Sequence, residues 1–66
     1  MDKVKFAVVG VGGLGMGHIR GIKLNSDIAE LVCVCDNVEE IAKRVGNQYN
    51  VPYYLDFYEM IKVGGF

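Results

Sequence analysis

Three glycines near the N-terminus and one aspartate further on have the types and spacing needed to bind a phosphorylated ligand. Gly10, Gly12 and Gly15 form the pattern G-x-G-x-x-G, and Asp36 follows 21 positions after the last of them. Such glycines let a strand turn sharply into a helix and let a pyrophosphate approach the backbone N–H groups at the helix N-terminus. An acid at the end of the next strand accepts hydrogen bonds from the adenosine ribose and repels a 2′-phosphate. The four residues predict a dinucleotide site that prefers NAD to NADP.

The elements that must position these residues follow from the apolar pattern. Val4–Val9 is a mostly apolar run that stops at glycine, which predicts a buried strand. Leu14–Leu24 has apolar residues at the three- and four-residue steps of a helix. Residues 31–35 form a second apolar run, which predicts a strand ending at Asp36. The glycine pattern therefore lies between a strand and a helix, as a dinucleotide-binding loop requires.

A second helix is predicted after Asp36. Asn37, with Glu40 three residues later, has the pattern of an N-cap and capping box. The helix is expected to run to about Tyr49, with Asn50 in the left-handed conformation after its end.

A short strand and a short helix are predicted at the C-terminal end. Pro52 leads into an extended piece at residues 53–55, and Asp56 with Glu59 repeats the capping pattern. Two glycines, Gly64 and Gly65, end this helix. The order β-α-β-α-β-α predicts an α/β, Rossmann-like half-domain with a three-stranded parallel sheet in the order 3-2-1.

Other residues that could do chemistry have simpler interpretations. A lone histidine such as His18 in a helix is more typical of packing or hydrogen bonding than of catalysis. We interpret Cys33 and Cys35 as buried strand residues on opposite faces of the sheet, and not as a metal or redox site. A glycine-rich turn that binds nothing is the alternative for the loop. No Gly-Lys-Ser or Gly-Lys-Thr follows the glycines, which excludes a Walker A loop.

Composition narrows the class of protein and its partners. The chain has 66 residues and a formal net charge of −1, with its basic residues scattered. Nucleic acid and anionic membrane are therefore not expected as partners. The apolar run near the N-terminus is too short to span a bilayer and lacks a signal-peptide cleavage site, so we expect a cytoplasmic location.

Taken together, these blocks resemble the N-terminal segment of the glucose–fructose oxidoreductase / inositol dehydrogenase (Gfo/Idh/MocA) family. The glycine block at residues 4–15, His18, the strand and acid at residues 31–36, and residues 49–61 carry the likeness. The His18 spacing and the Val51-Pro52 block are more specific than the glycines, which many Rossmann proteins share. The resemblance covers essentially the whole chain.

The resemblance implies NAD or NADP as cofactor and an oxidoreductase acting on sugars, inositols or related polyols. It implies that the pyrophosphate is lined by Gly10, Gly12, Gly13, Leu14 and Gly15, and that Asp36 meets the adenosine ribose. The family's Glu-Lys-Pro segment, with its catalytic-site lysine, has no counterpart up to Phe66. We therefore expect residues 1–66 to be a partial dinucleotide-binding domain that contains no catalytic and no metal-binding residue.

Two other functions are compatible with the same residues. One is a Rossmann nucleotide-binding or regulatory module without catalysis, and the other is a truncated product without function. In either case the predicted strand order leaves Val4–Val9 at an unprotected sheet edge, which predicts self-association.

Overall fold

The computed structural model describes residues 3–12 and 14–66, with Leu14 described only by its backbone. Its elements are β1 (Val4–Val9), α1 (Leu14–Leu24), β2 (Ala29–Cys35), α2 (Glu39–Tyr49), β3 (Tyr53–Tyr54) and α3 (Phe57–Val63). The predicted order β-α-β-α-β-α is confirmed. β2 begins two residues earlier than the apolar run indicated, because Ala29 pairs with the first residue of β1.

The three strands form one parallel sheet with β2 at its centre. β1 pairs with β2 from Val4 opposite Ala29 to Val9 opposite Cys35, with one irregularity between Phe6 and Ala7. β3 pairs with the other edge of β2 through its two residues. The order β1-β2-β3 is the predicted order 3-2-1 counted from the opposite edge. Among the described residues, β1 is therefore an edge strand.

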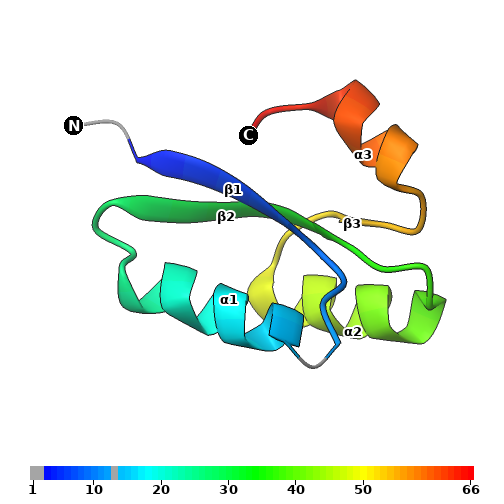
Figure 1. Ribbon diagram of the computed structural model, residues 1–66, viewed down its shortest axis with the longest axis horizontal. Coiled ribbons are helices and arrows are strands. Elements are labelled where there is room, and N and C mark those ends of the chain that lie inside the picture. The colour runs from blue at the N-terminus through cyan, green and yellow to red at the C-terminus, as the bar shows by residue number, and fades with distance from the viewer. Residues whose placement is uncertain (1–2, 13) are drawn as a thin grey trace.

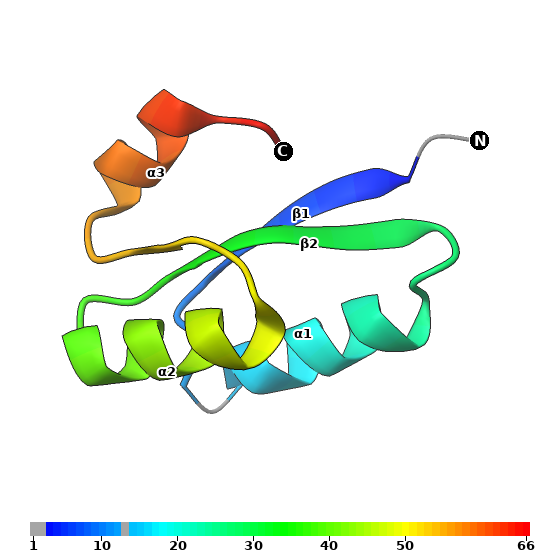
Figure 2. The ribbon, with the colours of Figure 1, turned by 180° about the vertical axis from the view of Figure 1, so that it is seen from behind.

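The helices lie in two layers. Figures 1 and 2 show α1 and α2 side by side below the sheet, and α3 above it. Two successive right-handed crossovers in the same direction along a sheet place their helices on the same face, which explains this arrangement. The short helix α3 follows the end of the sheet and covers part of the other face.

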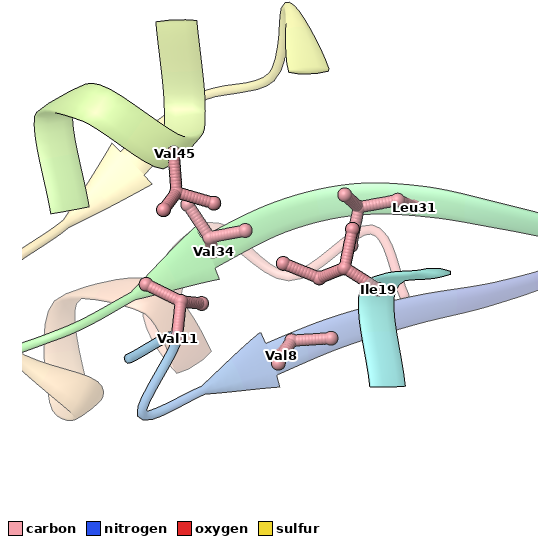
Figure 3. Close-up of a cluster of buried hydrophobic side chains, with 6 residues drawn as sticks. All are labelled: Val8, Val11, Ile19, Leu31, Val34 and Val45. Atoms are coloured by element: carbon pink, nitrogen blue, oxygen red, sulfur yellow. The ribbon is translucent and has the colours of Figure 1, made fainter. Parts of the chain in front are cut away.

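The main core lies between the sheet and helices α1 and α2. Its six buried side chains come from β1, β2, α1, α2 and the glycine loop, which is the loop with the G-x-G-x-x-G pattern between β1 and α1. Figure 3 shows them: Val8, Val11, Ile19, Leu31, Val34 and Val45. Full burial of a valine or isoleucine side chain contributes about 1.5–3 kcal/mol, so this cluster is the main stabilising contact between the layers.

A smaller core lies under α3, where Met60 packs with Cys33 and Cys35. The expectation that the two cysteines point to opposite faces is wrong. Side chains alternate along a strand, so residues two apart share a face. Both thiols are buried and free.

The helix ends follow the predicted signals at three of four places, one of which is Gly64 directly after α3. Asn50 has φ 59° and ψ 42°, the expected left-handed conformation after α2. Asp56 caps α3, where its carboxylate accepts a hydrogen bond from the backbone N–H of Tyr58 at 2.8 Å. The predicted N-cap at Asn37 is wrong, because α2 is capped by Val38, with no side-chain capping bond among the described residues. The carboxylate of Asp36 binds the N–H of Val38 instead and moves the start of the helix one residue further along.

Candidate functional site

The glycine loop joins β1 to α1, and its first and last glycines, Gly10 and Gly15, lie in close backbone contact. Gly10 has φ +76° and donates its N–H to the carbonyl of Cys35 at 2.8 Å, at the ends of both strands. A Cβ on Gly15 would overlap the carbonyl oxygen of Gly10 and lie 2.8 Å from its carbonyl carbon. Real Cβ atoms essentially never approach so closely, so only glycine lets the helix begin here. The first and third glycines thus shape the turn.

The second glycine leaves the outer side of this loop open. Gly12 is exposed, and the nearest described atom to a Cβ placed on it would be Cδ1 of Ile41, at an ordinary contact distance of 3.7 Å. The fold therefore does not require glycine here, whereas a ligand lying against the backbone would. Gly13 and the side chain of Leu14, both predicted to line the pyrophosphate, lie outside the described residues.

Asp36 lies directly beside the loop, at the end of β2. One carboxylate oxygen, Oδ2, accepts a hydrogen bond from the N–H of Val11 at 3.1 Å. The other, Oδ1, accepts one from the N–H of Val38 at 2.9 Å. The Asp36 residue is only 9% exposed. A carboxylate has about four acceptor positions, so about two remain for a ligand.

A hollow of about 300 Å³ opens between the loop and the ends of the strands. Its lining includes Gly10, Asp36, Asn37, Leu55 and Phe57. It combines the polar group of Asp36 with apolar walls, as a site for a nucleotide does. Neither Leu55 nor Phe57 is among the site residues that the sequence predicted. They follow β3 as Asp36 follows β2, and the carboxyl ends of parallel strands meet at one edge of a sheet.

His18 lies away from this hollow. It is exposed on α1 and faces a larger hollow of about 390 Å³, which is bounded by α1 and the edge strand β1. Val4 and Phe6 line that hollow from β1, and Gly17 and Gly21 from the helix. The structure therefore brings together Gly10, Gly12, Gly15 and Asp36 and leaves His18 outside the group.

The cysteines have the chemistry of core residues. Burial, and secondly the charge of Cys35, raise the pKa of the Cys33 thiol. Burial, followed by the charges of Asp36 and Asp56, raises that of Cys35. Both therefore stay protonated at neutral pH, and thiolates are the form that binds metals. In the described part of the chain, no three His, Cys, Asp or Glu side chains are placed to hold a metal ion.

The residues at this edge of the sheet fit a dinucleotide. The loop has an exposed glycine where a phosphate would approach, the N-terminus of α1 follows it, and an acid with spare acceptor positions lies beside it. Free N–H groups at a helix N-terminus and the positive end of its dipole favour phosphate. A separate finding is that none of the helices within residues 3–12 and 14–66 is long and apolar enough to cross a membrane.

Comparisons with known proteins agree with this site. Residues 4–64 match the family model described as the Gfo/Idh/MocA oxidoreductase family, NAD-binding Rossmann fold. No curated protein matches the chain. The chain is similar to the WlbA dehydrogenase from Bordetella pertussis, solved in complex with NADH and UDP-GlcNAcA. The TM-score is 0.92 at 28% identity, covering 97% of this chain and 20% of that one.

The WlbA dehydrogenase from Chromobacterium violaceum, solved with the same two ligands, gives a TM-score of 0.90 at 25% identity and covers 96% of this chain and 18% of that one. The chain thus spans about a fifth of the length of these structures. The family match extends over nearly all of the sequence and over every element of the fold. The chain belongs to the Gfo/Idh/MocA oxidoreductase family and carries its NAD-binding Rossmann fold.

Proposed function

We propose that NAD binds across the glycine loop and the end of β2. The pyrophosphate lies against Gly10, Gly12, Gly13, Leu14 and Gly15, and the adenosine ribose donates its hydroxyls to Asp36. The observation that carries this assignment is the open surface at Gly12, next to the tight contact between Gly10 and Gly15. The fold needs the first and third glycines, and the ligand accounts for the second.

The adenine is assigned to the hollow beside Asp36, between Leu55 and Phe57. These two side chains are among its lining and offer apolar surface to a base. When bound, the cofactor supplies a nicotinamide C4 that accepts or donates a hydride. The residues of this chain hold and orient the adenosine half of the molecule and do not contact the reacting carbon.

NAD is the preferred cofactor in this proposal. Asp36 is a largely buried carboxylate, and a 2′-phosphate on the ribose would bring a like charge against it. The two residues that follow, Asn37 and Val38, supply no cation to offset that repulsion.

A sugar or polyol is the proposed substrate class of the oxidoreductase. The support is that the two similar dehydrogenases were solved with a UDP-sugar as well as NADH. Because the chain spans about a fifth of those proteins, we propose that residues 1–66 form a partial dinucleotide-binding domain. Catalysis and substrate binding then need residues other than these. A cytoplasmic location and the absence of a nucleic-acid partner remain predictions from the composition.

Replacement of Gly12 by valine tests the cofactor site. The side chain would project where the pyrophosphate lies, so the Kd for NAD should rise at least about tenfold, while the far-UV circular dichroism stays unchanged. Gly17→Ala is the matched control, because a Cβ there meets no described atom within 4 Å and lies outside the loop. An unchanged Kd for Gly12→Val, measured by calorimetric titration, would refute the assignment.

We also propose that the 66-residue chain self-associates through β1. Three apolar side chains of this edge strand are exposed: Val4 by 59%, Phe6 by 41% and Val9 by 52%. An apolar strand edge is a template for pairing with another chain. Light scattering should show a species larger than a monomer, and Phe6→Lys should reduce the proportion of that species. A monodisperse monomer, with β1 amides protected from exchange up to the global unfolding limit, would contradict this proposal.

A further inference from the structure

We propose that Asp36 has a second role as a positioning residue: its carboxylate holds the glycine loop in the shape that receives the pyrophosphate. This inference rests on the proposed function, because it assigns the loop to the phosphates. It adds that Asp36 acts on a part of the ligand that it does not touch.

The first observation is the bond between Asp36 and the loop. Oδ2 of Asp36 accepts the N–H of Val11 at 3.1 Å, across 25 residues of sequence, and the bond is buried. Val11 lies between the first two glycines of the pattern. The carboxylate thus binds the backbone of the turn at its centre.

The second observation is that both ends of this bond are held in place. Val11 is fully buried in the main core with Val8 and Val34, which fixes the loop at that residue. Asp36 is fixed by two further bonds. Its Oδ1 accepts a hydrogen bond from the N–H of Val38 at 2.9 Å, and its backbone N–H donates to the carbonyl of Tyr54 at 3.0 Å. Asp36 therefore connects the loop to the start of α2 and to the end of β3.

Loss of the carboxylate would leave the N–H of Val11 buried without an acceptor. A buried N–H without a partner is strongly disfavoured, so the loop would move until that group meets water. The apparent Kd of a ligand is its intrinsic Kd divided by the fraction of molecules in the binding-competent shape. If that fraction falls to about a tenth, every ligand that uses the loop loses about tenfold in affinity.

The two roles of Asp36 can be separated by removing the ribose hydroxyls from the ligand. ADP carries the diphosphate and both hydroxyls, whereas 2′,3′-dideoxy-ADP carries the diphosphate alone. If Asp36 served only the ribose, Asp36→Ala would leave the affinity for dideoxy-ADP unchanged. Because Asp36 also holds the loop, we expect Asp36→Ala to lower the affinity for dideoxy-ADP by about five- to tenfold and to lower the affinity for ADP by more.

Two further variants make the comparison specific. Asp27→Ala removes the same charge from an exposed position before β2, at the opposite end of that strand, and should leave both affinities within about twofold of wild type. Asp36→Asn keeps one acceptor oxygen. We expect that oxygen to bind the buried N–H of Val11 rather than the partly exposed N–H of Val38, so Asn should restore most of the affinity for dideoxy-ADP.

Amide hydrogen exchange of the ligand-free chain gives a readout independent of nucleotide. The N–H of Val11 should exchange at least about tenfold faster in Asp36→Ala, more than the N–H of Val34 in the core, and should stay protected in Asp36→Asn. If the wild type bound no ADP while Val11 behaved in this way, the nucleotide function would be wrong, and only the contact by which Asp36 holds the loop in shape would stand. Unchanged Val11 exchange in Asp36→Ala, or an unchanged affinity for dideoxy-ADP where wild type binds it, would overturn the inference.

Discussion

Replacing Gly15 by alanine should lower the free energy of unfolding by at least about 2 kcal/mol. The new Cβ would overlap the carbonyl oxygen of Gly10 and lie 2.8 Å from its carbonyl carbon, whereas carbon atoms in contact are about 3.5–4.0 Å apart. The junction of β1 and α1 must therefore open by more than about 1 Å. Overpacking costs about 1–3 kcal/mol and occasionally more, and an overlap with backbone atoms lies at the upper end or above it. The better helix propensity of alanine returns at most about 1 kcal/mol.

Thermal unfolding followed by circular dichroism measures this effect. In a domain of this size, 1 kcal/mol shifts the midpoint by about 4–8 °C, so Gly15→Ala should unfold at least roughly 8 °C below wild type. Gly17→Ala, two residues further along the same helix, has the opposite expected sign. A Cβ there meets no described atom within 4 Å, so helix propensity alone should raise stability by about 0.5–1 kcal/mol. If Gly15→Ala matched or exceeded wild type, the close contact of loop and helix would be refuted.

Three other predictions concern the cofactor, a helix end and the thiols. Asp36→Ser should narrow the ratio of the dissociation constants for NADP and NAD, and comparable constants in wild type would contradict the preference for NAD. Asn50→Ala should cost about 1 kcal/mol in chemical unfolding, because φ is 59° there, whereas Asn50→Gly should cost nothing. The pKa values of Cys33 and Cys35 are raised above the ordinary 9.0, so the folded state keeps these protons longer than the unfolded one. The stability that the two protonated thiols contribute is complete below pH 9.0 and is lost as the pH rises toward their pKa values in the folded state. The melting temperature of a Cys33→Ala/Cys35→Ala variant should therefore fall less than that of wild type between pH 8 and 10.

The features that the sequence predicted correctly depend on local signals. Gly10 ends an apolar run at the point where the chain must turn, and Asn50 tolerates the left-handed conformation that a helix end requires. Asp56 caps a helix through a residue two positions away. Each of these involves atoms within a few residues of one another, so residue type and spacing were enough.

The features that the sequence missed depend on contacts between distant segments. Asn37 has the residue type of an N-cap, but the N-cap is Val38, whose N–H is bound by the carboxylate of Asp36. That carboxylate is held in place by the N–H of Val11, 25 residues earlier. The tight position of Gly46 in α2, where a Cβ would lie 3.0 Å from the Cβ of Tyr53, follows only from the packing of the helix on β3. No local pattern distinguishes such a glycine from one in open space.

The central position of β2 has a consequence for the order of folding. Each pairing that β2 makes is parallel and is closed by a whole helix, so Val8 meets Val34 only after the chain has closed a loop of 25 intervening residues. Loop closure over such distances precedes any gain from strand pairing, which makes parallel sheets slower to form than hairpins. We therefore expect α1 and α2 to fluctuate into helix early, and the docking of both onto β2 to limit the folding rate. Val34 belongs to the main core together with residues of both helices, Ile19 of α1 and Val45 of α2. Substitutions at Val34 should then slow folding, whereas those in α3 should mainly speed unfolding.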